Sequence, residues 1–158
     1  MINNKYNIFF NTVNFNELKI AIRSLCRLDF RNEKKIKKYE NQFSKMLDYK
    51  FAYTFATGRM CLYNILSAIN VKKGDEIILP SYTCAVVPNA ILYKGMKPVY
   101  VDIDLKNFNQ NIDDMIKKIT KKTKIIYIQN TYGIDCDIKK LKNIEKKFDI
   151  FFIEDNTH

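Results

Sequence analysis

The amino-acid sequence predicts an α/β fold with three layers, in which a mostly parallel sheet carries helices on both faces. Two observations predict it. From residue 58 onward, segments with helical periodicity alternate with short apolar segments typical of strands. The strand segments are apolar nearly throughout, as is usual where both faces of a parallel sheet are covered. With 158 residues, of which 47% are hydrophobic, the chain is long enough to bury a core in a single domain.

The first third of the chain is expected to be helical. Residues 14–27 and 33–47 each carry apolar side chains at spacings of three and four, with charged residues between them. A third helix is expected over 58–69, where Leu62, Ile65, Leu66 and Ile69 fall on one face.

The alternation of strands and helices follows in order. Strands are expected over residues 75–80, 97–103, 123–130 and 149–155, and the helices between them over residues 84–93, 112–119 and 138–147. The last strand is so apolar that we expect it in the middle of a sheet. The polar turns after the strands, including "PSYT", "NTYG" and "EDNTH", should meet at the carboxyl edge of the sheet, where ligands bind in open α/β folds.

Composition excludes several classes of protein. The sequence has neither a signal-peptide pattern nor an apolar run of membrane-spanning length, so we expect a cytoplasmic protein. Four widely spaced cysteines fit neither a zinc site nor a disulfide framework. The formal charge of +10 comes mostly from lysines scattered over helix segments, which is typical of solvated faces and not of a nucleic-acid interface. Salt-dependent binding to duplex DNA would revive that alternative.

Three short stretches carry candidate site residues. Residues 56–59, "ATGR", precede a helix, so free backbone N–H groups there could bind a phosphate, although the same residues also make ordinary caps. Asp155 follows four apolar residues, and a carboxylate there would need either a cationic partner, such as a protonated cofactor ring nitrogen, or a capping role. His158 could hydrogen-bond a ligand. Tyr82, Thr83 and Cys84 follow another strand and could wall the same cleft, but a Cys84 nucleophile lacks an identifiable triad.

The order of motifs resembles the DegT/DnrJ/StrS family of sugar aminotransferases, which depend on pyridoxal 5'-phosphate (PLP). The resemblance begins at "YENQFSKMLDYKFAYTFATGR" and continues through "GDEIILPS", "KPVYVDID", "TKII", "YG" and "ED", so it covers nearly the whole chain. It implies the large domain of a fold-type I PLP enzyme and a homodimer. It also implies transfer of an amino group from glutamate to a nucleotide-linked keto-sugar, in the synthesis of surface glycans or other amino sugars.

The resemblance assigns roles to the candidate residues. Gly58, Arg59 and Met60 match the turn that holds the cofactor phosphate, largely through backbone amides. Asp155 matches the aspartate that pairs with the pyridine nitrogen, and His158 matches a Gln or His that faces the ring. Cys84 stands where the family usually has an aromatic residue stacked on the ring, and Asn156-Thr157 replaces a commoner small pair.

The family's Schiff-base lysine lies beyond the position of His158, so no catalytic residue is assigned within the chain. We therefore expect residues 1–158 to be the N-terminal part of the PLP-binding large domain, without the rest of that domain and without the small C-terminal domain. Two alternatives remain open. In the dehydratase branch of the family a histidine replaces the lysine, and a non-catalytic remnant of a truncated gene would at most bind phosphate-bearing ligands or dock on an intact subunit. A fragment of this kind is expected to oligomerise or to be poorly soluble through an unpaired strand edge.

Overall fold

The computed structural model describes residues 14–27, 32–137, 140–142, 144 and 148–157. The chain divides into two compact units, Met1–Thr54 and Phe55–His158. Within the described residues no helix is long and apolar enough to cross a membrane.

Two capped helices make up the described part of the first unit. Helix α1 spans Phe15–Cys26 and begins with a capping box, in which Asn14 and Glu17 each accept a hydrogen bond from the backbone of the other. Helix α2 spans Glu33–Met46. Its buried residue Glu40 accepts hydrogen bonds from the backbone N–H (2.9 Å) and the hydroxyl (3.0 Å) of Thr54, so the segment that follows α2 is fastened to the helix.

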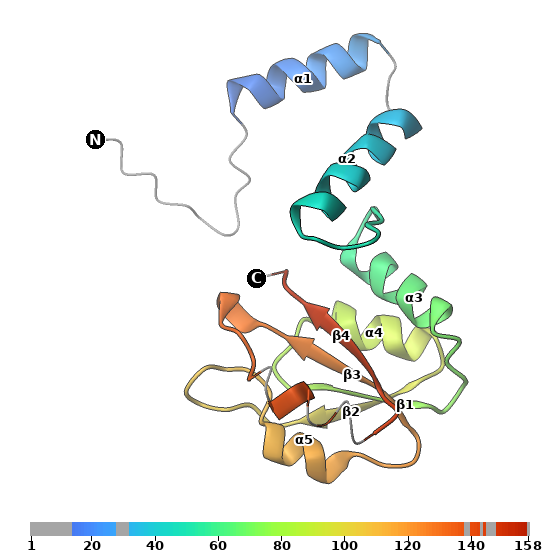
Figure 1. Cartoon of the computed structure of the whole chain (residues 1–158), viewed down its shortest axis with the longest axis vertical. Coiled ribbons are helices and arrows are strands. Elements are labelled where there is room, and N and C mark those ends of the chain that lie inside the picture. The colour runs from blue at the N-terminus through green and yellow to red at the C-terminus, as the bar shows by residue number, and fades with distance from the viewer. Residues whose placement is uncertain (1–13, 28–31, 138–139, 143, 145–147, 158) are drawn as a thin grey trace. The chain divides into compact units, whose positions relative to one another are not determined.

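The second unit is built on a parallel sheet of four strands (Figure 1). The strands are β1 (Glu76–Pro80), β2 (Lys97–Val101), β3 (Thr123–Gln129) and β4 (Phe151–Asp155). They lie in the order β2-β1-β3-β4, and all three pairings are parallel. After β1 the chain forms β2 on one side of β1 and then crosses to form β3 on the other side, so the direction of strand addition reverses at β1. Ligands of open α/β sheets bind at the carboxyl ends of the strands beside such a reversal.

Helices cover both faces of this sheet (Figure 1). One face packs against α3 (Gly58–Ala68) and α4 (Val86–Tyr93), with Leu62, Leu66 and Ile91 in contact with alternate strand residues. The opposite face packs against α5 (Ile112–Lys118) and the helical residues 140–142 and 144. The three-layer α/β prediction is confirmed. The predicted apolar face of α3 is confirmed too, since Ile65 and Ile69 also pack against the core between α3, α4 and the sheet.

The expected helix and strand segments are found with their ends displaced by a few residues, except that part of the helix predicted over 138–147 lies outside the described residues. The expectation that the last strand is central is wrong for the described sheet. Strand β4 lies at its edge and pairs only with β3 there, and Phe151 is 56% exposed. The apolar composition of β4 reflects packing on both faces of the sheet, because Ile153 faces the α3–α4 core while Phe152 packs against the core on the other side.

Candidate functional site

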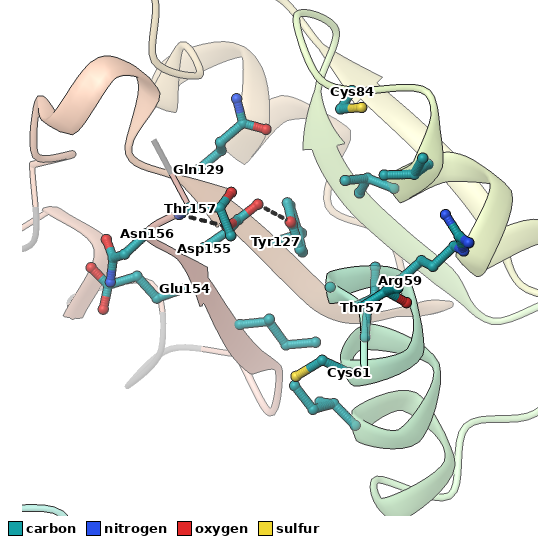
Figure 2. A pocket seen from close by; sticks show the side chains of 16 residues that line it. Thr57, Arg59, Cys61, Cys84, Tyr127, Gln129, Glu154, Asp155, Asn156 and Thr157 are labelled. Carbon is teal, nitrogen blue, oxygen red and sulfur yellow. Dashed lines mark hydrogen bonds between the residues drawn. The ribbon is translucent and has the colours of Figure 1, made fainter. Parts of the chain in front are cut away.

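An open cleft with a volume of about 490 Å³ lies at the carboxyl ends of the strands in the second unit (Figure 2). It is bounded by the start of α3, the start of α4 with the turn before it, and the ends of β3 and β4. Its polar and cysteine lining residues are Thr57, Arg59, Cys61, Cys84, Tyr127, Gln129, Glu154, Asp155, Asn156 and Thr157.

The start of α3 offers hydrogen-bond donors to this cleft. Thr57 caps the helix, and its hydroxyl accepts a long hydrogen bond of 3.4 Å from the backbone N–H of Met60. The backbone N–H groups of Gly58 and Arg59 have no hydrogen-bond partner among the described residues. Free N–H groups and the positive end of the helix dipole favour an anion at this position.

Asp155 places a carboxylate in the cleft beside Glu154. Its carboxylate accepts a hydrogen bond at Oδ2 from the hydroxyl of Tyr127 on β3, and another at Oδ1 from the backbone N–H of Thr157 at 3.0 Å (Figure 2). Asp155 forms no ion pair with any described residue, and Figure 2 shows the side chain of Arg59 pointing away from it. The protein thus orients this carboxylate but leaves its charge without a cation among the described side chains.

Burial and the charge of Asp155 keep the neighbouring acidic groups protonated. Burial of the ring is the main cause that raises the pKa of Tyr127 far above its usual range, and its hydrogen bond to Asp155 adds to the rise. Burial also raises the pKa of the Cys61 thiol, with a smaller contribution from the charge of Asp155. Tyr127 is therefore a hydrogen-bond donor at any physiological pH, and Cys61 is a neutral thiol and a poor nucleophile.

A hydrogen-bonded network supports one wall of the cleft. Gln129 accepts a hydrogen bond of 2.7 Å from the Thr83 hydroxyl and donates one of 3.3 Å to the Thr131 hydroxyl. The hydroxyls of Tyr82 and Tyr132 lie 2.7 Å apart. Tyr82 and Thr83, which the sequence suggested as cleft walls, are not among the lining residues, and Thr83 instead fixes the Gln129 side chain that is one of them.

The structure brings most of the candidate residues to one place. Gly58, Arg59, Cys84 and Asp155 all line the cleft, although they come from three separate segments. Met60 lines a neighbouring groove between α3 and α4, so only its backbone N–H, bonded to Thr57, is near the candidate phosphate position. His158 lies outside the described residues.

Sequence reasoning missed three residues that shape the cleft: Cys61, Tyr127 and Gln129. Cys61 follows the candidate phosphate turn by one helical turn, which could have placed it beside that turn. Tyr127 and Gln129 alternate with buried isoleucines on β3, and a phenol or amide on a buried strand requires a hydrogen-bond partner. That requirement could have directed attention to the strand end where Asp155 stands.

Comparison with known proteins identifies the family of the chain. The model of the DegT/DnrJ/EryC1/StrS aminotransferase family matches residues 15–158. The chain belongs to this family.

Relatives with assigned names include enzymes of two kinds. A GDP-perosamine synthase of Escherichia coli O157:H7 is 36% identical over 120 residues, which are 76% of this chain and 33% of that protein. A GDP-4-keto-6-deoxy-D-mannose 3-dehydratase of Yersinia pseudotuberculosis is 28% identical over 146 residues, which are 89% of this chain and 37% of that one. The solved E. coli GDP-4-keto-6-deoxy-D-mannose-3-dehydratase, with bound hydrated PLP, superposes with a TM-score of 0.85 at 27% identity over 96% of this chain and 40% of its own. The chain thus spans about a third of the length of the curated relatives that it matches.

Proposed function

We propose that this chain is the N-terminal part of the PLP-binding large domain of an enzyme that aminates a nucleotide-linked keto-sugar, with glutamate as the amino donor. One observation carries the proposal. The Asp155 carboxylate and the free N–H groups at the start of α3 line a single cleft at the sheet reversal, in a chain of this family.

The residues of the cleft fit PLP. In this proposal the backbone N–H groups of Gly58 and Arg59 bind the phosphate, with Met60 contributing through an N–H that it shares with Thr57. The Asp155 carboxylate accepts a hydrogen bond from the protonated pyridine nitrogen, which would provide the cation that the described residues do not supply. Cys84 lies against the ring, and a contact with the ring is also proposed for His158, which lies outside the described residues. PLP bound in this way supplies an electron sink for carbanion chemistry, and the carboxylate keeps the ring nitrogen protonated so that the sink stays strong.

The substrate assignment is supported by the relatives, whose names include a GDP-perosamine synthase and dTDP- and UDP-sugar aminotransferases. We propose a nucleotide-linked keto-sugar as the amino acceptor and a homodimer as the working assembly, in the synthesis of surface glycans or other amino sugars. By its resemblance to the family, this cleft departs from the commoner pattern at Cys84, Asn156 and Thr157.

A second candidate is the dehydratase reaction, which removes a sugar hydroxyl in place of adding nitrogen. It is favoured by the structural match to the E. coli dehydratase and by the extent of the match to the Yersinia enzyme. Gly58, Arg59 and Asp155 would bind PLP in the same way in both reactions, so these residues do not separate them.

Two measurements test the proposal. Equilibrium dialysis of the purified protein with PLP should show saturable binding that weakens by about tenfold or more in Asp155→Asn, as expected for loss of a charged hydrogen-bond acceptor. The absence of saturable binding would contradict the proposal. Sequencing the coding DNA downstream of codon 158 separates the alternatives: an in-frame lysine after a Ser- and Gly-rich approach indicates the aminotransferase, a histidine there indicates the dehydratase, and an immediate stop indicates a remnant.

A further inference from the structure

We propose that Tyr127 is a positioning residue, which holds the Asp155 carboxylate in the orientation that receives the ring nitrogen of the cofactor. The inference rests on the proposed function of Asp155 and adds to it a residue from the neighbouring strand.

The register of the sheet brings the two side chains together. Tyr127 pairs with Ile153 in the parallel β3–β4 ladder, and Asp155 follows Ile153 by two residues on the same face. The ring of Tyr127 is only 5% exposed and packs in the α3–α4 core with Ile125 and Ile153. The hydroxyl of this packed ring donates a hydrogen bond to the Oδ2 atom of Asp155 (Figure 2).

The hydrogen bonds to the Asp155 carboxylate leave acceptor positions on it available to a ligand. Tyr127 occupies one acceptor position on Oδ2, and the backbone N–H of Thr157 occupies one on Oδ1. Each carboxylate oxygen can accept a second hydrogen bond, so the group is prevented from rotating while an acceptor position stays available to a ligand N–H. Because burial and Asp155 hold the pKa of Tyr127 far above neutrality, its hydroxyl stays a donor in this arrangement.

A purely structural role for Tyr127 makes a different prediction. If the hydroxyl merely found a convenient partner for a buried phenol, its removal would change the stability of the fold, and any effect on the cofactor would be independent of Asp155. A positioning residue acts only through Asp155. The two roles are therefore distinguished by a double-mutant cycle on PLP affinity.

The experiment measures PLP affinity by equilibrium dialysis for the wild-type protein, Tyr127→Phe, Asp155→Asn and the double variant. Tyr127→Phe keeps the buried ring and removes only the hydroxyl, and we expect it to weaken PLP binding by about tenfold, as for a hydrogen bond to a charged group. In the Asp155→Asn background the same substitution should change the affinity by less than about twofold. The control is Tyr100→Phe, on the other edge strand and 43% exposed, which should leave the affinity unchanged.

A second readout follows the absorbance of bound PLP against pH. With Asp155 held in place, the ring nitrogen should keep its proton to a higher pH than in Tyr127→Phe, and a structural role alone would not move this midpoint. Urea unfolding without PLP shows whether each variant folds.

The outcomes are separable. Equal affinity and an unchanged pH midpoint for wild type and Tyr127→Phe, or the same loss in both Asp155 backgrounds, would overturn the inference while the proposed function stands. If the wild-type protein shows no saturable PLP binding, the proposed function fails and this inference fails with it.

Discussion

The two ends of the parallel sheet use acidic side chains in opposite ways. At the amino end, Glu76 begins β1 with a side chain that is 7% exposed; it accepts hydrogen bonds from the Thr120 hydroxyl at 2.6 Å and from the Lys97 ammonium at 3.2 Å. At the carboxyl end, Asp155 accepts hydrogen bonds from Tyr127 and Thr157 and has no cation among the described residues.

With the proposed function, the difference separates an acid that stabilises the fold, Glu76, from an acid that is proposed to bind a ligand, Asp155. The charge of Glu76 is balanced within the protein, so it contributes to the stability of the sheet and has little left to offer a ligand. The charge of Asp155 is oriented but not balanced, and it faces free backbone donors in a cleft. A binding site can therefore be recognised by charges and hydrogen-bonding groups that the fold leaves without partners, as well as by its residue types.

The largest expected effect comes from the core strand that joins the two ends. Ile78 on β1 is fully buried, and Ile78→Ala should reduce the free energy of unfolding by about 2–5 kcal/mol, because it leaves a cavity between the sheet and α5. Urea unfolding followed by circular dichroism measures the change. Leu105→Ala, at a position 83% exposed, is the control and should stay within about 0.5 kcal/mol of wild type. Equal effects at both positions would contradict the assignment of the core.

Separate substitutions of Glu76 and Asp155 should separate the effect on stability from the effect on PLP binding. Glu76→Ala should cost about 1–3 kcal/mol of unfolding free energy, because it removes a buried acceptor from Thr120 and Lys97, and it should leave PLP affinity unchanged in the folded protein. Asp155→Asn should weaken PLP binding and change stability less. Paired unfolding and dialysis measurements on both variants check this. If Glu76→Ala weakened PLP binding as much as Asp155→Asn, the contrast between the two ends would be wrong.

The amino end should also govern part of the acid sensitivity. The hydrogen bond from Thr120, followed by the interactions with Lys97, lowers the pKa of Glu76 in the folded state. Its stabilising contribution is therefore complete above the unfolded pKa of about 4.3 and is lost as the pH falls through the lower folded value. Thermal unfolding measured from about pH 6 to pH 3 should show a shallower decline for Glu76→Gln than for wild type. Part of the decline should remain, because Lys118 also lowers the pKa of Asp114.

Much of the fold could be predicted because its signals are local. The apolar stripe on α3 and the alternation of strands and helices depend on spacing within each segment, and both are found in the structure. The position of β4 could not be predicted, since strand order depends on contacts between segments that composition does not encode. The apolar residues of β4 are consistent with either a central or an edge position.

The candidate site was predictable at the segment ends and not inside them. Gly58 and Asp155 stand out because a helix start and a strand end leave polar groups in characteristic positions. Tyr127 lies within an apolar strand, and its partner is fixed by the pairing of Tyr127 with Ile153, which a single sequence does not reveal. Its role in the site emerges only when the register of two strands is known.

The smallest expected effects compare two helix caps on opposite faces of the sheet. Asn111 caps α5 by accepting a hydrogen bond of 3.0 Å from Asp114, whereas the Thr57 cap of α3 is longer, at 3.4 Å. Asn111→Ala should therefore cost about 1 kcal/mol and Thr57→Ala about 0.5 kcal/mol in unfolding free energy. Only Thr57→Ala should weaken PLP binding, by a few-fold, because Thr57 lines the cleft and fixes the turn whose N–H groups are proposed to bind the phosphate. Dialysis with PLP and with inorganic phosphate as competitor measures this, and a loss of affinity in Asn111→Ala as large as that in Thr57→Ala would place the phosphate site elsewhere.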